Sequence, residues 1–448
     1  MVHASGSGTA SVEYIINIPE RIHDLCIYRV PPKLRQVNPK AYTPRHISIG
    51  PFHHGEPQFK AMEELKKRYD LEFRKRIKSD RPFHVFNAYI GNNDIWNCYA
   101  DISMPDKKEF VGMIELDAVF IMEFLLRLRD RVHYKDDDYV MSKPWLIEGI
   151  CLDLILLENQ LPIKVLNELY TFLDEEESST FLDLACKYGF LKPPSIKFSE
   201  TKPNLVCKCF CRATENPKPK NQCQHERTTN AKHFTDLLRC FYIPSNLNVD
   251  ASDDSDYVIS YSATKLRDSG ISFKAVRERY LLDVNFKNHS YIFWLFSFVT
   301  CFKITKARLE LPKLIIDDGI ECKLRNLIAL EQCHYPDKSY ICNYVSLIDG
   351  LIETKGDVDF LLEQKVIVNY LGSNDAVAKL VNSLGSELTI SSSCYKAKIR
   401  EINAHYENPF NQTMATIRRV YFKDLRRTSS TIVGLAILAF TSFGYSLK

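Results

Sequence analysis

Residues 145–170, WLIEGICLDLILLENQLPIKVLNELY, decide how the rest of the chain is arranged. Residues 150–157 are apolar on every helical face apart from Asp153, and a helix of this kind belongs in the middle of a large core. A proline pushes the residue before it out of the helical region. We therefore expect the first helix to end near Leu161, and a second helix, starting at Pro162, to run to the end of the stretch.

The junction between the two expected helices is polar, because Glu158, Asn159 and Gln160 follow one another there. A buried amide or carboxylate without a partner is costly, so these side chains should hold the junction together through hydrogen bonds. Glu331 and Gln332 repeat the pattern of a carboxylate beside an amide after an apolar run. We interpret these five residues as a structural polar cluster, whose two groups are candidates to meet in the core.

The composition is that of an ordinary globular protein, with 45% hydrophobic and 26% charged residues in a chain of 448. A formal net charge of +3 gives no reason to expect nucleic-acid binding. Residues 1–12 are small and polar, so they predict a disordered N-terminus and lack the apolar core of a secretory signal. Without export the fourteen cysteines should stay reduced. No motif points to a bound cofactor.

Helical spacing dominates the rest of the chain, so the expected fold is mainly α, of the α+β kind. Residues 26–57 are rich in proline and predict turns, and residues 191–232 predict a flexible surface insertion. Residues 271–276, 280–286 and 308–316 alternate like strands and predict a small antiparallel sheet. Helices are expected at residues 58–73, 233–241, 326–333, 340–354, 358–362 and 376–382.

Several motifs follow one another in a characteristic order. They are Arg29-Val-Pro-Pro, Tyr42-x-Pro-x-x-Ile-Ser-Ile-Gly-Pro-Phe-His-His-Gly, Met62-Glu-x-x-Lys, Asp117-Ala-Val-Phe-Ile-Met-Glu-Phe-Leu, Asp153-Leu-Ile-Leu-Leu-Glu-Asn-Gln-Leu-Pro, Ser262-Ala-Thr-Lys-Leu-Arg-Asp-Ser-Gly and Arg325-Asn-Leu-Ile-Ala-Leu-Glu-Gln-Cys. In this order the chain resembles the plant family catalogued as domain of unknown function 247, also called uncharacterised protein family 0481. The resemblance runs from about residue 24 to the C-terminus.

What the resemblance implies is a single, mainly helical domain, which we place at residues 13–427, followed by a hydrophobic segment. No catalytic activity is attached to the family. Some members of the family are linked to pollen–stigma self-recognition in grasses, which suggests a role in recognition. Residues 289–306 depart from the family, whose other members pass directly between two strands there. This insertion is either an added hairpin strand, a segment that dips into a membrane surface, or an unspliced piece of the gene model.

The best metal candidates lie within the expected insertion, where thiols alternate with other residues. Zinc sites commonly leave two to four residues between paired cysteines, whereas the first three cysteines here are separated by single residues. We therefore favour a metal-free loop over a zinc site. The candidate ligands are Cys207, Cys209, Cys211, Cys223 and His225.

The C-terminus carries 17 consecutive residues without a charge at 431–447, and residues 428–430 extend this stretch to 20. A helix of that length spans about 30 Å, enough to cross a bilayer. We predict a transmembrane tail anchor at residues 428–447, in contact with membrane lipid. Basic residues upstream of it favour a cytosolic body and can bind anionic lipid; they are Arg418, Arg419, Lys423, Arg426 and Arg427.

Together these features predict a non-enzymatic, membrane-anchored recognition or signalling protein with an unidentified protein partner and no nucleic acid. The alternative is a hydrolase that uses Glu158 or the pair His53/His54. Such an enzyme needs a nucleophile, a base and oxyanion donors in one cleft, and the sequence shows no such set. An open pocket on which Glu158 and His53 converge would favour this alternative.

Overall fold

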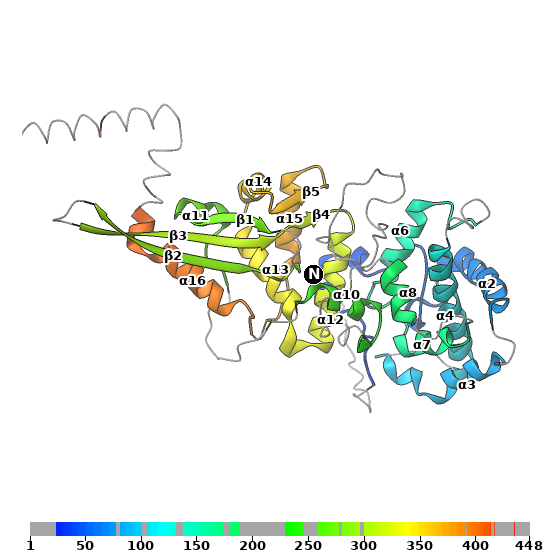
Figure 1. The fold of residues 1–448 in the computed structure, drawn as a ribbon. Coiled ribbons are helices and arrows are strands. Elements are labelled where there is room, and N and C mark those ends of the chain that lie inside the picture. The colour runs from blue at the N-terminus through cyan, green and yellow to red at the C-terminus, as the bar shows by residue number, and fades with distance from the viewer. Residues whose placement is uncertain are drawn as a thin grey trace, which may run out of the picture.

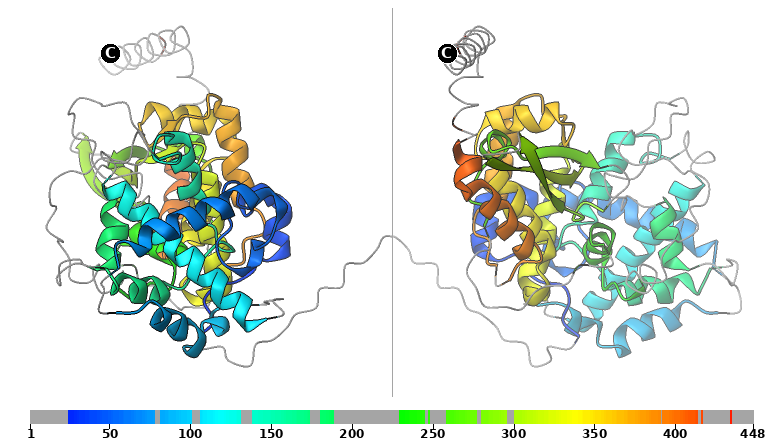
Figure 2. Two further views of the ribbon diagram at one scale, coloured as in Figure 1. Left: turned by 90° about the vertical axis from the view of Figure 1, so that its right-hand side faces the viewer. Right: turned by 60° about the vertical axis from the view of Figure 1, so that its left-hand side comes forward.

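The computed structural model describes residues 24–77, 81–100, 106–130, 138–173, 180–188, 229–244, 247, 258–276, 280–295, 300–390, 392–413, 416 and 434. This part of the chain is mostly helical, with two small sheets, as the expected mainly α class requires (Figure 1). Figure 1 and the right-hand view of Figure 2 show two groups of helices lying side by side. Residues 1–12, the candidate metal ligands, and the segment 428–447 apart from Gly434 lie outside the described residues.

The first group of helices is built around α4 (Lys107–Arg129), which contacts α2, α3, α7 and α8. Asp106 caps the start of α4, because its carboxylate accepts a hydrogen bond from the backbone N–H of Lys108 at 3.0 Å. From Ala118 to Leu126 every residue of α4 is buried, as an all-round apolar helix requires. The other helices of this group are α2 (Lys60–Arg74), α3 (His84–Asn92), α6 (Pro144–Asp153), α7 (Ile163–Tyr170) and α8 (Phe181–Tyr188). Helix α1 (Pro32–Val37) belongs to the proline-rich segment, whose η1 (Pro39–Ala41) contacts α12 (Ile320–His334).

The second group packs around α12 (Ile320–His334), which contacts α10, α13 and α15. Its helices are α10 (Phe234–Tyr242), α11 (Ala263–Asp268), α13 (Tyr340–Leu351), α14 (Lys355–Glu363), α15 (Asn374–Leu384) and α16 (Lys396–Glu407). Each helix expected in this region from the hydrophobic spacing is present. Their ends differ by several residues because caps such as the Thr354–Asp357 capping box, and not the apolar pattern, set where helices start.

The sheets correct the expected antiparallel arrangement. In the three-stranded sheet the order is β1-β3-β2, and β1 (Ser272–Val276) is parallel to β3 (Thr300–Pro312), whereas β2 (Asn285–Leu295) is antiparallel to it. The second sheet pairs β4 (Leu314–Ile316) with β5 (Ile367–Asn369) in parallel. Strand alternation shows which face of a strand is buried but not its direction, so the mixed sheet could not be read from the pattern.

The backbone of the insertion at residues 289–306 forms an extended hairpin. Its backbone continues the pairing of β2 with β3 from His289 opposite Lys306 to Leu295 opposite Thr300. In Figure 1 this hairpin projects beyond the helices. Within the described residues, no helix combines the length and the apolar character that crossing a membrane requires.

The junction at residues 154–161 differs from the expectation that the first helix ends near Leu161. Helix α6 ends at Asp153, and Pro162 lies just before α7 and not inside it. The reason is competition by side chains: the amide group of Gln160 donates to the carbonyls of Leu154 and Leu156, both at 2.7 Å. Carbonyls that a continuing helix would pair with its own N–H groups are thus already satisfied. Buried apolar residues from both groups of helices form one continuous core across this junction.

Gly50 is the backbone position that this junction constrains most. Its φ of 73° and ψ of −174° belong to a region that is essentially restricted to glycine, and a Cβ there would lie 2.7 Å from the backbone oxygen of Gln160. Gly55 also has a positive φ, of 77°, but a Cβ at Gly55 meets nothing within 4 Å. A comparison of alanine substitutions at the two glycines therefore distinguishes the cost of backbone strain from the cost of a steric clash.

We expect Gly50→Ala to lower the free energy of unfolding by at least about 3 kcal/mol, because strain and clash add. The matched control Gly55→Ala should cost only about 1–2 kcal/mol, from the left-handed backbone alone. Thermal and urea unfolding of both variants measures the difference. Equal losses in the two variants would show that the close approach of Gly50 to Gln160 does not constrain the fold.

Candidate functional site: a buried polar cluster

The backbone of residues 45–47 is held by a single carboxylate. Asp153, at the end of α6, accepts hydrogen bonds from the backbone N–H groups of Arg45, His46 and Ile47, with shortest distances of 3.0, 2.6 and 2.9 Å. Asp153 is buried, and burial raises its pKa although these N–H groups act in the opposite direction. The carboxylate thus replaces the partners that this turn-rich backbone would otherwise find in water.

The same backbone is held further along by two more side chains. The N–H of Ile49 donates to Oδ1 of Asn159 at 2.6 Å, and the N–H of Gly50 donates to Oδ2 of Asp117 at 2.8 Å. The amide nitrogen of Asn159 donates in turn to the carbonyls of Ile47 and Asp153, at 3.1 and 2.9 Å. Asn159 therefore ties the segment 45–50 to the junction through both ends of its side chain.

A buried ion pair completes this part of the cluster. The ammonium group of Lys66, on α2, lies 2.6 Å from Oδ1 of Asp117 and 2.5 Å from the carbonyl of Ser48. It also contacts Glu63. Both partners are fully buried, and burial raises the pKa of Asp117 although Lys66 acts to lower it. A buried charge is tolerated when it is paired and hydrogen-bonded, and the pair fixes α2 against α4.

Glu158 anchors the start of the proline-rich segment. Its Oε1 accepts from the backbone N–H of Val30 at 2.6 Å, and its Oε2 pairs with the guanidinium of Arg35. Burial acts to raise the pKa of Glu158, but the contacts with His53, Arg35 and the Val30 N–H outweigh it, so the pKa is lowered. Glu158 is thus held as a carboxylate, with both oxygens occupied.

His53 lies between two carboxylates. Its Nδ1 is 2.8 Å from Oε1 of Glu56, and its Nε2 is 3.5 Å from Oε2 of Glu158, an ion-pair distance without hydrogen-bond geometry. Burial acts to lower the pKa of His53, but the two carboxylates outweigh it, so the pKa is raised. His53 is therefore favoured in its charged form, which suits an ion pair better than a general base.

Gln160 joins the second group of helices to the junction. Its Oε1 accepts from the backbone N–H of Phe234, at the start of α10, at 2.9 Å. Next to it, the Nε2 atom of the buried His233 is 3.0 Å from the carbonyl of Cys26, and burial lowers the pKa of His233 to about 4. Three chain segments far apart in sequence therefore meet at one buried point.

Glu331 and Gln332 have partners of their own in the described chain. Glu331 is fully buried, accepts from Nε of Arg239 at 2.8 Å and caps the start of α13 through the N–H groups of Ile341 and Cys342. Gln332 donates to the carbonyl of Thr389 at 2.7 Å. These partners differ from those described for Glu158, Asn159 and Gln160, so the suggested meeting of the two groups is not seen in their described contacts.

Asn326 of α12 connects the junction to the second group. Its Oδ1 accepts from the backbone N–H of Leu157 at 2.9 Å, and its amide nitrogen donates to the carbonyls of Ala41 and Cys322, both at 2.8 Å. Helix α12, the junction and the proline-rich segment are thereby held by one side chain.

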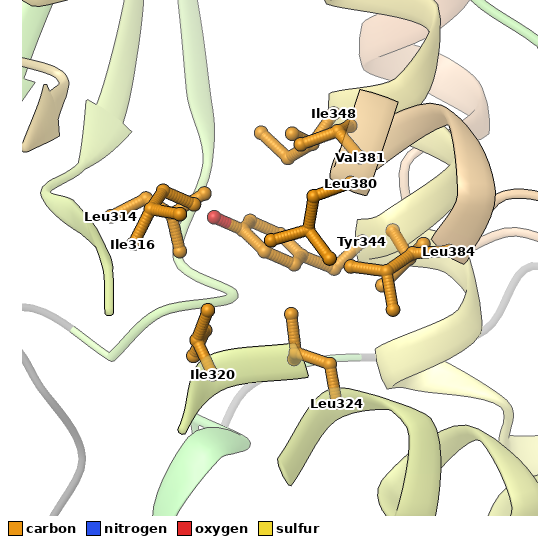
Figure 3. Close-up of a pocket in the computed structure, with 10 residues that line it drawn as sticks. Leu314, Ile316, Ile320, Leu324, Tyr344, Ile348, Leu380, Val381 and Leu384 are labelled. Atoms are coloured by element: carbon orange, nitrogen blue, oxygen red, sulfur yellow. The ribbon is translucent and has the colours of Figure 1, made fainter. Parts of the chain in front are cut away.

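The hydrolase alternative requires that Glu158 and His53 converge and that they do so at an open pocket, and the structure meets the first of these conditions. Glu158 and His53 do converge, but the cavity drawn in Figure 3 lies elsewhere, between β4, α12, α13 and α15. It is lined by aliphatic side chains and Tyr344, and burial raises the pKa of that tyrosine. His54 is half-buried in the turn after His53. Within the described residues, the ion-pair partners of His53 are carboxylates and not a hydroxyl or thiol nucleophile.

Several residues of the cluster were not identified from the sequence as site residues: Arg35, Lys66, Asp117, Asp153 and Asn326. Asp117 did carry a signal, because it is a carboxylate in a helix that is apolar on the following turns. Lys66 carried less, since it sits in a charged helix where most lysines face solvent. Where the structure describes the chain, no group of three or more His, Cys, Asp or Glu side chains is arranged to hold a metal ion.

We expect Glu158→Ala to lower soluble yield and to reduce the free energy of unfolding by about 3–5 kcal/mol, because it leaves Arg35, His53 and an N–H group without their partner. Glu56→Ala is the matched control, since it removes the other carboxylate of His53 from a site whose side chain is 39% exposed. It should cost less than about 1 kcal/mol. Thermal unfolding decides: a Glu158→Ala protein that melts like wild type yet loses partner binding would make the cluster functional and not structural.

Comparison of the sequence with those of known proteins assigns this chain to a family. A model of the plant family DUF247, described as "Plant protein of unknown function", matches residues 27–440. A UPF0481 protein of Arabidopsis thaliana is 26% identical over 426 residues, covering 89% of this chain and 80% of the relative. A second UPF0481 protein of that plant is 24% identical over 483 residues, covering 91% and 89%. No solved structure matches the chain. The chain therefore belongs to the DUF247 family of plant proteins, as its ordered motifs indicate.

Proposed function

We propose that this chain is a non-enzymatic recognition protein, whose binding surface includes the exposed side of residues 29–45. The proposal rests on the observation that the buried carboxylates are already hydrogen-bonded to the backbone. Asp153, Glu158 and Asp117 each accept hydrogen bonds from the backbone of the segment that runs from residue 29 to residue 50. Groups that would serve as catalytic acids or bases are thereby used to fix the shape of one surface segment.

The exposed side of this segment is basic. From Cys26 to Gly55 the sequence has five Lys or Arg residues and no Asp or Glu. Four of the five are exposed: Arg29, Lys33, Lys40 and Arg45. The guanidinium of Arg29 lies 4.5 Å above the ring of Phe52, which fixes one charge in place. A rigid surface of one sign of charge favours a protein partner with an acidic surface.

The membrane part of the proposal rests on the sequence of the C-terminal segment. Residues 428–447 carry no charge, and the basic residues before them would lie at an anionic membrane surface. An anchor of this kind would hold the recognition surface in the cytosol next to the membrane, where it would meet its partner.

A hydrolase using Glu158 or the pair His53/His54 is the second candidate. The observation in its favour is the 3.5 Å approach of His53 to Glu158. Against it stand the two occupied oxygens of Glu158 and the raised pKa of His53, because a general base must be unprotonated to accept a proton and a raised pKa favours the protonated imidazole.

The recognition surface is tested by reversing its charge. We expect the double variant Lys33→Glu/Lys40→Glu to unfold at the temperature of the wild type, since both side chains are exposed. It should lose most of the acidic proteins that the full-length chain retains in affinity purification from plant tissue, measured by quantitative mass spectrometry. Lys108→Glu/Lys355→Glu, which reverses two exposed lysines elsewhere, is the control. Identical sets of retained proteins from the two double variants would refute the surface.

The anchor is tested by membrane fractionation of the full-length chain and of residues 1–427. We expect the full-length protein to remain in the membrane pellet after alkaline carbonate extraction, because a spanning helix is held by the bilayer core. The shortened protein should appear in the supernatant. Extraction of the full-length protein by carbonate would exclude a spanning anchor.

A further inference from the structure

Two buried cysteines lie opposite each other in a short parallel pairing. The backbone N–H groups of Cys26 and Ile27 both donate to the carbonyl of Cys98, at 3.0 and 2.9 Å. The N–H of Ala100 donates to the carbonyl of Ile27 at 2.9 Å, and Ile27 bridges Tyr99 in parallel. Because each cysteine directly precedes a residue of this bridge, Cys26 and Cys98 occupy facing positions.

The spacing of facing residues suits a disulfide. Paired strands lie about 4.8 Å apart, and side chains at facing positions leave on the same side of the pairing. Disulfides join Cα atoms that are about 4.4–6.8 Å apart, so the bond needs no rearrangement of the backbone. Both residues are buried, with exposed fractions of 4% and 1%, and in the structure both are free thiols.

The two thiols are chemically unequal. The contact with the Cys26 thiol lowers the pKa of Cys98, and the nearby ammonium group of Lys164 acts in the same direction. The contact with the Cys98 thiol raises the pKa of Cys26, and burial raises it further. A thiol with a lowered pKa is the better initial nucleophile, and a neighbouring thiol then resolves the oxidised product.

We propose that Cys26 and Cys98 form a redox modification site, which closes to an intramolecular disulfide in the presence of a small peroxide. The Cys98 thiolate attacks one oxygen of hydrogen peroxide, the O–O bond breaks, and the leaving hydroxide takes up a proton to become water. The sulfur of Cys26 then attacks the sulfenic acid on Cys98, forms the S–S bond and releases a second water. Two thiols are oxidised by two electrons in total, and one peroxide is reduced to two waters.

Formation of the Cys26–Cys98 disulfide would fix the chain just before the exposed basic residues of the segment 29–45. Cys26 lies three residues before Arg29, whereas Cys98 is the last residue of η4 (Ile95–Cys98), next to Tyr99. The hydroxyl of Tyr99 donates to the carbonyl of Gln160 at 3.0 Å, so η4 is itself bound to the junction. A disulfide here would attach the start of the proline-rich segment covalently to the core and would restrict the unfolded chain.

The test uses the full-length chain, purified under reducing conditions and titrated with hydrogen peroxide until cysteines outside the pair react. Free thiols are then blocked, and the protein is digested without reduction for mass spectrometry. We expect a peptide that links Cys26 to Cys98 before other pairs form. We also expect a rise of a few degrees in the midpoint of thermal unfolding, reversed by dithiothreitol. Reduced Cys26 and Cys98 at the end of the titration, or either one joined to a different cysteine, would overturn the proposal.

Single variants test the order of the two steps. In Cys26→Ser, the sulfenic acid on Cys98 should persist and react with dimedone, whereas in Cys98→Ser the Cys26 thiol should stay reduced. Cys186→Ser, at a half-buried thiol on α8, is the control and should leave the Cys26–Cys98 disulfide and its thermal shift unchanged. Dimedone labelling of Cys26 in Cys98→Ser, with Cys98 unlabelled in Cys26→Ser, would overturn the assigned order.

Discussion

The structure depends on a small set of side chains that take over the hydrogen bonding of a buried backbone. The segment from residue 29 to residue 56 is too rich in proline to form a long helix or a strand, yet residues 47–50 are buried. Buried N–H groups need partners, and here Asp153, Asn159 and Asp117 supply them. These acceptors come from α4, from the end of α6 and from the junction that follows it, so the fold of the segment depends on these elements.

The buried ionisable groups of this cluster also give it a preferred range of pH. Glu158 has a lowered pKa, so its contribution to stability is present above its ordinary value of 4.5 and is lost as pH falls through the lowered one. His53 has a raised pKa, so its contribution is fully present below 6.5 and is lost as pH rises through the raised value. Their mutual attraction therefore stabilises the fold most between these two ordinary values.

Much of the helical body could be predicted from the sequence, because periodic apolar residues report directly which face of a helix is buried. The pattern located α2, α10, α12, α13, α14 and α15, and the burial of Glu158, Asn159 and Gln160 follows from the apolar run before them. The features that the pattern did not predict depend on side-chain hydrogen bonds to the backbone. The end of α6 at Asp153 is set by Gln160, whose amide donates to the carbonyls of Leu154 and Leu156, while the Asp153 carboxylate binds residues 45–47, more than a hundred positions earlier.

The same limit applies to the candidate site. The sequence indicated that the Glu158 cluster is polar and buried, but not that Lys66 and Asp117 form a second buried pair beside it. A lysine in a charged helix looks like a solvent-exposed one until its partner is placed. The direction of β1 relative to β3 was likewise beyond the strand pattern, because parallel and antiparallel neighbours bury the same alternating face.

Side-chain acceptors hold the backbone of residues 45–50 as firmly as a helix holds its own backbone, and native-state hydrogen exchange can measure this. We expect the amides of Ile47, Ile49 and Gly50 to exchange as slowly as those in the middle of α4, only through global unfolding. Exchange of these three amides at the rate of the exposed loop residue Gly55 would show that the side chains do not hold this backbone.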